Sequence, residues 1–94
     1  RQIILGNSED CLKIEPLGDK WRSFGWNVFE IDGHNYSEIL AALNKAKKPN
    51  KKPNLIIANT VKGKGFSFSE NNNAWHHAPL SRSQYEAAIK ELKL

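Results

Sequence analysis

The sequence predicts an α/β fold: a fragment of a mostly parallel sheet whose strands are joined by crossover helices. Three observations favour this class. Short apolar or β-branched runs alternate along the chain with segments of helical periodicity. Residues 55–61 (LIIANTV) are nearly continuously apolar, as a buried parallel strand requires. The helical segments open on residues suited to a first turn or a cap.

The first third of the chain predicts a strand, a helix and a second strand. Residues 1–5 (RQIIL) read as a short strand that ends at a Gly-Asn pair. A helix is expected over residues 16–24, because proline suits a first helical turn and three large apolar residues share one face. Gly25 ends it. Residues 26–31 (WNVFEI) are too short for a helix and rich in β-branched and aromatic residues, which predicts a strand.

The remainder predicts two further helices, one further strand and a long loop. A helix with an apolar stripe begins after residue 35 and ends in a lysine-rich loop. The strand at residues 55–61 is followed by an irregular stretch, residues 62–80, which is unusually long for a compact domain unless it is functional or disordered. A final helix follows. Capping pairs open both helices, Asn35 with Glu38 and Ser81 with Gln84.

Three predicted strands make a thin sheet, so we expect further strands to have belonged to it. The chain contains no methionine and begins with arginine, which also favours a fragment. We therefore expect residues 1–94 to be a portion of one module, with no internal domain boundary.

Composition limits the classes of partner that we expect for this chain. The net charge is +4, and much of it lies in residues 45–52 (KAKKPNKK). No aromatic residue interleaves with these lysines, so a solvated loop is expected and no nucleic-acid partner. No apolar run reaches membrane-spanning length, so no membrane partner is expected. The single cysteine, Cys11, cannot form an internal disulfide, which favours a cytoplasmic location.

Two loops follow predicted strands at the edge where parallel sheets bind ligands: residues 32–35 and residues 62–65 (KGKG). Glycines allow close backbone approach and lysines attract phosphate, although a flexible turn is the plainer interpretation. The adjacent histidines His76 and His77 lack the neighbouring ligands of a zinc site. One of them could act as a hydrogen-bond donor or acid–base group, or both could simply be exposed.

Three segments resemble transketolases in order and spacing: DKWRSFGWNVFEIDGHN, NLIIANTVKGKGFSFSENNNAWHHAP and SQYEAAIKEL. The likeness is greatest to the bacterial and archaeal type that is split into two polypeptides. The resemblance implies a thiamine-diphosphate-binding fold and an enzyme that moves a two-carbon ketol unit between sugar phosphates. It also implies a magnesium or calcium ion and a partner, the pyrimidine-binding module, in a homo- or hetero-oligomer.

On this resemblance, His76 matches the family histidine that reaches the cofactor diphosphate and the substrate. We expect it to be the main catalytic residue, stabilising charge or shuttling a proton; a second histidine follows it where the family often has glycine. The resemblance places Lys62, Gly63, Lys64 and Gly65 in the loop that approaches the diphosphate.

The start of the chain aligns with the strand after the family's metal-ligating asparagine. The backbone carbonyl of Gln2 then corresponds to a metal ligand, and a peptide oxygen suits a hard cation. The other metal ligands and the glutamate that activates the cofactor are not in this chain. We therefore expect the chain alone to be inactive.

Three alternatives remain at this stage. The related 1-deoxyxylulose-5-phosphate synthases share the KGKG loop and a following histidine, although the WHH context after ENNN favours transketolase. A non-catalytic remnant or assembly partner is the second. A basic nucleic-acid-binding module is the third, and it predicts salt-sensitive binding to oligonucleotides.

Overall fold

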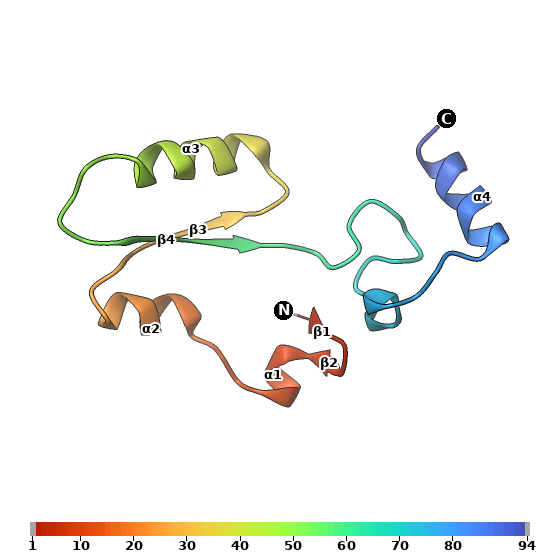
Figure 1. Cartoon of the computed structure of the whole chain (residues 1–94), viewed down its shortest axis with the longest axis horizontal. Coiled ribbons are helices and arrows are strands. Elements are labelled where there is room, and N and C mark those ends of the chain that lie inside the picture. Colours follow the sequence, from red (N-terminus) through yellow and green to blue (C-terminus); the bar gives the residue numbers. More distant parts are fainter. Residues whose placement is uncertain (1, 94) are drawn as a thin grey trace. The chain divides into compact units, whose positions relative to one another are not determined.

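The computed structural model describes residues 2–93 and divides the chain into two compact units (Figure 1). One unit is Leu12–Thr60. The other combines the residues up to Cys11 with those from Val61 onward. Each unit is described by itself below.

The Leu12–Thr60 unit has the predicted α/β alternation. Its elements are α2 (Leu17–Ser23), β3 (Asn27–Asp32), α3 (Tyr36–Ala46) and β4 (Asn54–Asn59). The two strands pair in parallel, from Asn27 opposite Asn54 to Asp32 opposite Asn59. Parallel pairing confirms that the segments following β3 and β4 leave from the same edge of this sheet.

Local chemistry sets the start of α3 as the sequence predicts. The Asn35 side chain accepts hydrogen bonds from the backbone N–H groups of Ser37 and Glu38. The Glu38 carboxylate reaches back to the backbone N–H of Asp32, at 2.8 Å, and to the Asn35 side chain, at 3.2 Å. The end of β3 is thereby tied to the first turn of α3.

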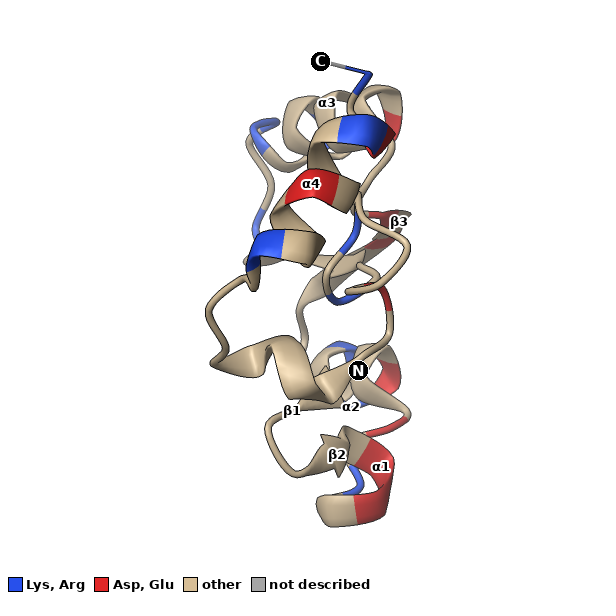
Figure 2. Cartoon of the chain, turned by 90° about the vertical axis from the view of Figure 1, so that its right-hand side faces the viewer, with Lys and Arg blue, Asp and Glu red and all other residues tan. Residues whose placement is uncertain are grey.

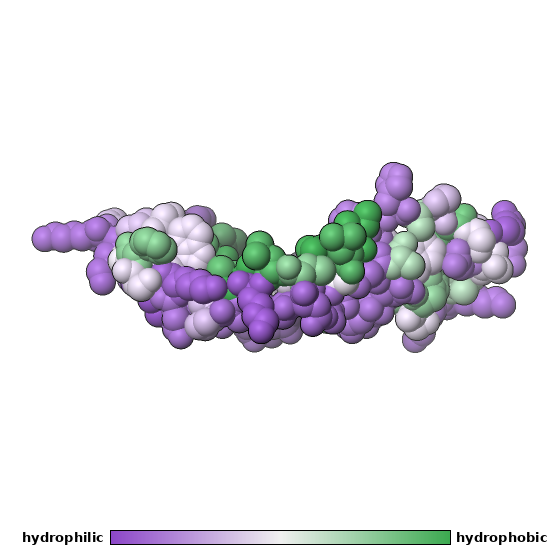
Figure 3. All heavy atoms as spheres, turned by 90° about the horizontal axis from the view of Figure 1, so that it is seen from below, coloured by the Kyte–Doolittle hydropathy of each residue, from purple (hydrophilic) through white to green (hydrophobic). Residues whose placement is uncertain are grey.

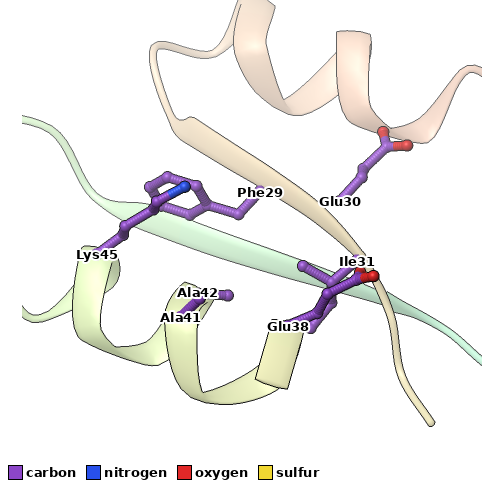
Figure 4. A pocket seen from close by; sticks show the side chains of 7 residues that line it. All are labelled: Phe29, Glu30, Ile31, Glu38, Ala41, Ala42 and Lys45. Carbon is purple, nitrogen blue, oxygen red and sulfur yellow. The ribbon is translucent and has the colours of Figure 1, made fainter. Parts of the chain in front are cut away.

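The packing between α3 and the strands rests on small and branched residues. Ala42 is only 3% exposed and points toward the strands (Figure 4), and Ile57 of β4 is also buried. A shallow hollow of about 260 Å³ lies between β3 and α3 and contains none of the predicted site residues. Within the predicted apolar stripe, Tyr36 is 83% exposed and Leu40 61%. Most of the stripe is therefore open surface. Figure 3, which views the chain from below Figure 1, also shows apolar side chains at the surface.

The first predicted strand is wrong in extent and in pairing. β1 (Gln2–Ile3) turns back through Ile4 and Leu5 and pairs antiparallel with β2 (Gly6–Asn7); Arg1 lies outside the described residues. The parallel sheet therefore has two strands among the described residues, not three. The φ of Gly6 is +141°, which a residue with a Cβ rarely adopts, and it allows this return. α1 (Ser8–Cys11) follows.

The rest of this unit is a compact loop with a short 3₁₀ helix, η1 (Asn73–His76), and then α4 (Arg82–Glu91). Ser81 and Gln84 form the predicted capping box. Figure 2 shows basic and acidic residues along the surface of α4. No helix within residues 2–93 is long and apolar enough to cross a membrane.

Candidate functional site

The glycine–lysine loop after β4 is folded back tightly on itself. Gly63 has a φ of +71°, and a Cβ at this position would collide with the carbonyl oxygen of Ser69. The buried Ser69 donates its hydroxyl proton to the Gly63 carbonyl, at 2.8 Å. Only glycine therefore fits at position 63 without a shift of the neighbouring backbone.

Aromatic residues fix the segment that carries His76. Phe66 stacks on Phe68 at a centroid distance of 5.7 Å, and Phe68 contacts Trp75 at 5.3 Å. The Trp75 indole N–H also donates to the Phe68 carbonyl, at 3.1 Å. Since Trp75 immediately precedes His76 in η1, these contacts position the histidine backbone.

Lys62 and His76 meet. The Lys62 Nζ lies 2.9 Å from Nδ1 of His76, although 14 residues separate them in the sequence. Lys62 is half-buried and His76 is exposed. The lysine loop and the histidine segment, which the sequence presents as separate candidates, therefore form one cluster with a cationic group and an exposed imidazole.

Asn71 joins this cluster to the start of the chain. Its backbone N–H donates to the Lys62 carbonyl, at 2.9 Å. Its own carbonyl accepts from the Gln2 side-chain amide, at 3.2 Å. Asn71 therefore connects Gln2 to Lys62, and Lys62 in turn contacts His76. These three predicted site residues belong to one network of contacts.

Lys64 takes a different direction. Its Nζ forms an ion pair with Glu70 at 3.4 Å, and the same Glu70 oxygen accepts from the backbone N–H of Gly65 at 3.2 Å. The exposed pair is weak, because solvent screens it. Lys64 and Gly65 are therefore held by Glu70, while Lys62 is the lysine that contacts His76.

The other two histidines lie elsewhere. His77 is exposed and follows η1. His34 belongs to the turn after β3, where its backbone N–H donates to the Asp32 side chain at 2.8 Å. Of the two loops that the sequence places at the edge of the sheet, residues 32–35 therefore contain a turn that carries His34.

Sequence reasoning missed Ser69, Glu70 and Asn71 as parts of this cluster. Asn71 has a φ of +53°, and asparagine is among the few residues that adopt this conformation readily. The polar run ENNN, residues 70–73, was the available signal. The contacts of Ser69 and Glu70 have no comparable sequence pattern, because they depend on how the loop folds.

The Glu91 carboxylate on α4 forms hydrogen bonds with the same loop. Ser67 donates both its backbone N–H, at 2.9 Å, and its hydroxyl to the Glu91 carboxylate. The hydroxyl bond and then the backbone bond lower the pKa of Glu91 from the ordinary value of 4.5. The end of α4 is thereby connected to the turn that follows Gly65.

The described residues do not assemble a metal site by themselves. Residues 2–93 contain no cluster of three or more histidine, cysteine, aspartate or glutamate side chains suited to a metal ion. The side-chain Oε1 of Gln2 is buried and has no hydrogen-bond partner among the described residues. Its Nε2 donates to the Asn71 carbonyl, so only the oxygen of this side-chain amide is left without a partner among the described residues.

Comparison with known proteins shows which family the chain belongs to. The family model described as "Transketolase, thiamine diphosphate binding domain" matches residues 2–93. The 6-deoxy-6-sulfo-D-fructose transketolase subunit SqwG of Clostridium sp. (strain MSTE9) is 48% identical over 90 residues, which cover 96% of this chain and 33% of that subunit. Rat transketolase is 39% identical over 80 residues, covering 85% of this chain and 12% of that enzyme.

A solved structure agrees with these relatives. The crystal structure of transketolase from Campylobacter jejuni matches 97% of this chain with a TM-score of 0.83 and 34% identity, and the match covers 14% of that chain. The present chain thus spans about a third or less of the length of these relatives. It belongs to the transketolase family, and residues 2–93 match that family's thiamine-diphosphate-binding domain.

Proposed function

We propose that this chain is the closing part of a transketolase's diphosphate-binding module and supplies one rim of a thiamine-diphosphate site. The complete enzyme moves a two-carbon ketol unit between sugar phosphates. The observation that carries this proposal is the Lys62–His76 contact, at 2.9 Å. It lies in a loop whose tight fold requires glycine at position 63. A lysine ammonium, a glycine backbone that a ligand can approach closely and an exposed imidazole together suit a phosphorylated cofactor.

In this proposal Lys62, Gly63, Lys64 and Gly65 approach the diphosphate. The glycines leave no side chains in its way, and a lysine side chain attracts phosphate as a point charge. Lys64 must exchange Glu70 for the phosphate, a small cost because that pair is exposed. When bound, thiamine diphosphate supplies the carbanion chemistry.

His76 is the catalytic residue in this proposal. Its ring is exposed and its backbone is fixed through Trp75, so it can meet a substrate or diphosphate oxygen without a change in the loop. There it stabilises negative charge or moves a proton. His77, which has no comparable anchor among the described contacts, is not assigned a role.

For the metal we propose Mg²⁺ or Ca²⁺, with the Gln2 backbone carbonyl as one ligand. Hard cations take oxygen ligands such as a peptide carbonyl, and the Gln2 side chain reaches the loop through its hydrogen bond to the Asn71 carbonyl. Because residues 2–93 contain no carboxylate or histidine cluster, the remaining ligands must come from outside them. The metal would hold the diphosphate against the loop.

The metal ligands and the cofactor-activating glutamate that this proposal requires must come from partners. We propose that residues 1–94 join an upstream segment of the same module and the pyrimidine-binding module or subunit, in a homo- or hetero-oligomer. The relatives include proteins named as transketolase subunits, which supports a partner polypeptide. The exposed apolar residues of α3, such as Tyr36 and Leu40, support packing against further structure. Alone, the chain is inactive in this proposal.

We propose a cytoplasmic enzyme of pentose phosphate or related sugar metabolism. The named relatives differ in the sugar: 6-deoxy-6-sulfo-D-fructose for one subunit and apulose-4-phosphate for two others. All three names describe a sugar with an anionic substituent. This suggests a phosphorylated or sulfonated substrate for the complete enzyme that contains this chain.

A reconstitution assay tests the proposal. The chain is joined to an upstream segment and a pyrimidine-binding module from a split transketolase, and two-carbon transfer between sugar phosphates is measured with thiamine diphosphate and Mg²⁺. We expect transfer that depends on both additions and on the presence of residues 1–94. Transfer of equal rate without residues 1–94 would overturn the proposal.

A further inference from the structure

The Lys62–His76 contact assigns roles to the two ring nitrogens. A lysine ammonium has donors and no acceptor, so the ring nitrogen 2.9 Å from Nζ must accept. That nitrogen is Nδ1. A neutral imidazole that accepts at Nδ1 carries its proton on Nε2. The contact therefore favours the Nε2–H form of His76.

Both ends of this contact are held by other groups. The Lys62 backbone is fixed by the hydrogen bond from Asn71, at 2.9 Å. His76 directly follows Trp75 in the chain. The Trp75 indole N–H donates a hydrogen bond to the Phe68 carbonyl, and its ring packs on the Phe68 ring, so the backbone next to His76 is held in place. The Lys62 ammonium is therefore presented to His76 from a folded loop and not from a free chain.

The neighbouring lysine does not duplicate this role. Lys64 pairs with Glu70, which also accepts the Gly65 backbone N–H. Replacing Lys62 or Lys64 thus removes a similar charge from the same loop, but only Lys62 contacts the imidazole. The chain itself provides a matched control.

We propose that Lys62 is a positioning residue for His76: its ammonium holds the imidazole in the Nε2–H form, with that N–H on the side of the ring away from the lysine. This inference extends the proposed function and rests on it only for its catalytic meaning. His76 then meets an anionic oxygen as a neutral hydrogen-bond donor through Nε2. It is thereby distinguished from a histidine that acts first as a base at that atom.

Nitrogen-15 NMR of the histidine-labelled chain tests the proposal without any ligand. At about pH 8 an unperturbed imidazole is mostly neutral, and the chemical shifts of Nδ1 and Nε2 report which nitrogen carries the proton. Loss of one signal pair in His76→Gln assigns His76. We expect its Nε2 to be protonated and its Nδ1 signal to be displaced from that of His77, as an acceptor from an ammonium.

Three variants make the test specific. Lys62→Met should shift the Nδ1 signal of His76 toward that of His77, and Lys62→Arg, which still donates, should restore the displacement. Lys64→Met should leave the signal unchanged. Backbone amide spectra check that each variant keeps its fold. A protonated Nδ1 in the wild-type chain, or the same Nδ1 shift in the wild-type and Lys62→Met chains, would overturn the proposal.

The outcome is independent of the reconstitution assay. A Lys62-dependent Nδ1 shift together with absent transfer activity would reject the proposed function and leave the Lys62–His76 assignment standing. A Lys62-independent shift with full activity would do the reverse.

Discussion

Gly63 shows how a single backbone conformation shapes the candidate site. Its φ is +71°, and the Ser69 carbonyl occupies the space that a side chain would need. The Ser69 hydroxyl bonds to the Gly63 carbonyl from the same turn. The residue is thus constrained both by its conformation and by its neighbour.

We expect Gly63→Ala to lower the free energy of unfolding by more than about 1–2 kcal/mol, the cost of the left-handed conformation alone. Gly25→Ala is the matched control, because Gly25 has a similar φ of +86° but nothing within 4 Å of an added Cβ. Urea unfolding measures both. Equal losses in the two variants would show that the Ser69 contact has no effect.

The two adjacent histidines provide a second test at this scale. In the reconstituted enzyme, we expect His76→Ala to lower kcat by about 10²-fold or more, in the range of acid–base and charge-stabilising groups. His77→Ala should have a much smaller effect. Steady-state kinetics of two-carbon transfer measures both. Similar losses would mean that the wrong histidine has been assigned.

Single residues were predictable from the sequence where a short motif carries them. KGKG and WHH were each recognisable as candidates, and the family resemblance selected His76. The contact between Lys62 and His76 was not predictable, because it depends on the turn built by Ser69 and Asn71. Those two residues act through loop geometry, which has no fixed spacing in a sequence.

At the scale of elements, the start of α3 combines a cap with a connection to β3. Asn35 accepts from two N–H groups, and Glu38 accepts from the backbone of Asp32. The cap therefore holds the helix against the strand end as well as satisfying its first turn.

Asn35→Ala should destabilise the Leu12–Thr60 unit by about 1 kcal/mol, the usual effect of removing an N-cap. Ser37→Ala, on the same exposed turn, keeps the cap and should change stability little. Trp21 and Trp26 lie in this unit, 4.8 Å apart by ring centroid, so fluorescence can follow its urea unfolding. The account of the cap fails if the two variants are equally stable.

The connection between α4 and the loop predicts a pH dependence. The pKa of Glu91 is lowered in the folded chain, mainly by the Ser67 hydroxyl and then by the Ser67 backbone. A lowered folded-state pKa means that this contribution is present above the ordinary value of 4.5 and is lost as the pH falls through the lowered pKa.

Thermal unfolding between pH 7 and pH 3 can isolate this contribution. We expect Ser67→Ala and Glu91→Gln each to reduce the loss of Tm on acidification. Ser67→Ala removes the hydroxyl that lowers the pKa of Glu91 most, and Glu91→Gln removes the carboxylate itself. Ser67→Thr keeps a hydroxyl and should behave as the wild-type chain. An unchanged pH dependence in Ser67→Ala would contradict the assignment.

Elements were predicted well where their signals are local. Both capping pairs, the parallel strands and the final helix agree with the sequence within a residue or two. RQIIL was misread as a strand of the sheet because an apolar run does not reveal its pairing partner. The positive φ of Gly6, which allows β1 to return to β2, is invisible in the pattern.

At the scale of the whole molecule, the described residues bury little. The buried hydrophobic residues are Ala42, Ile57 and Ala88, and no large side chain among residues 2–93 is fully buried. The family and the α/β class were predictable because ordered motifs span the sequence. What packs against the exposed apolar surfaces was not predictable, because an apolar stripe shows that a face is suited to burial but not which surface covers it.

The central claim is that residues 1–94 form one rim of a thiamine-diphosphate site and not a complete one. Titration calorimetry with thiamine diphosphate and Mg²⁺ tests it most directly, on the chain alone and on the reconstituted enzyme. We predict no measurable heat of binding for the chain alone and saturable, metal-dependent binding for the assembly. Clear metal-dependent binding by the chain alone, or none by the assembly, would contradict the claim.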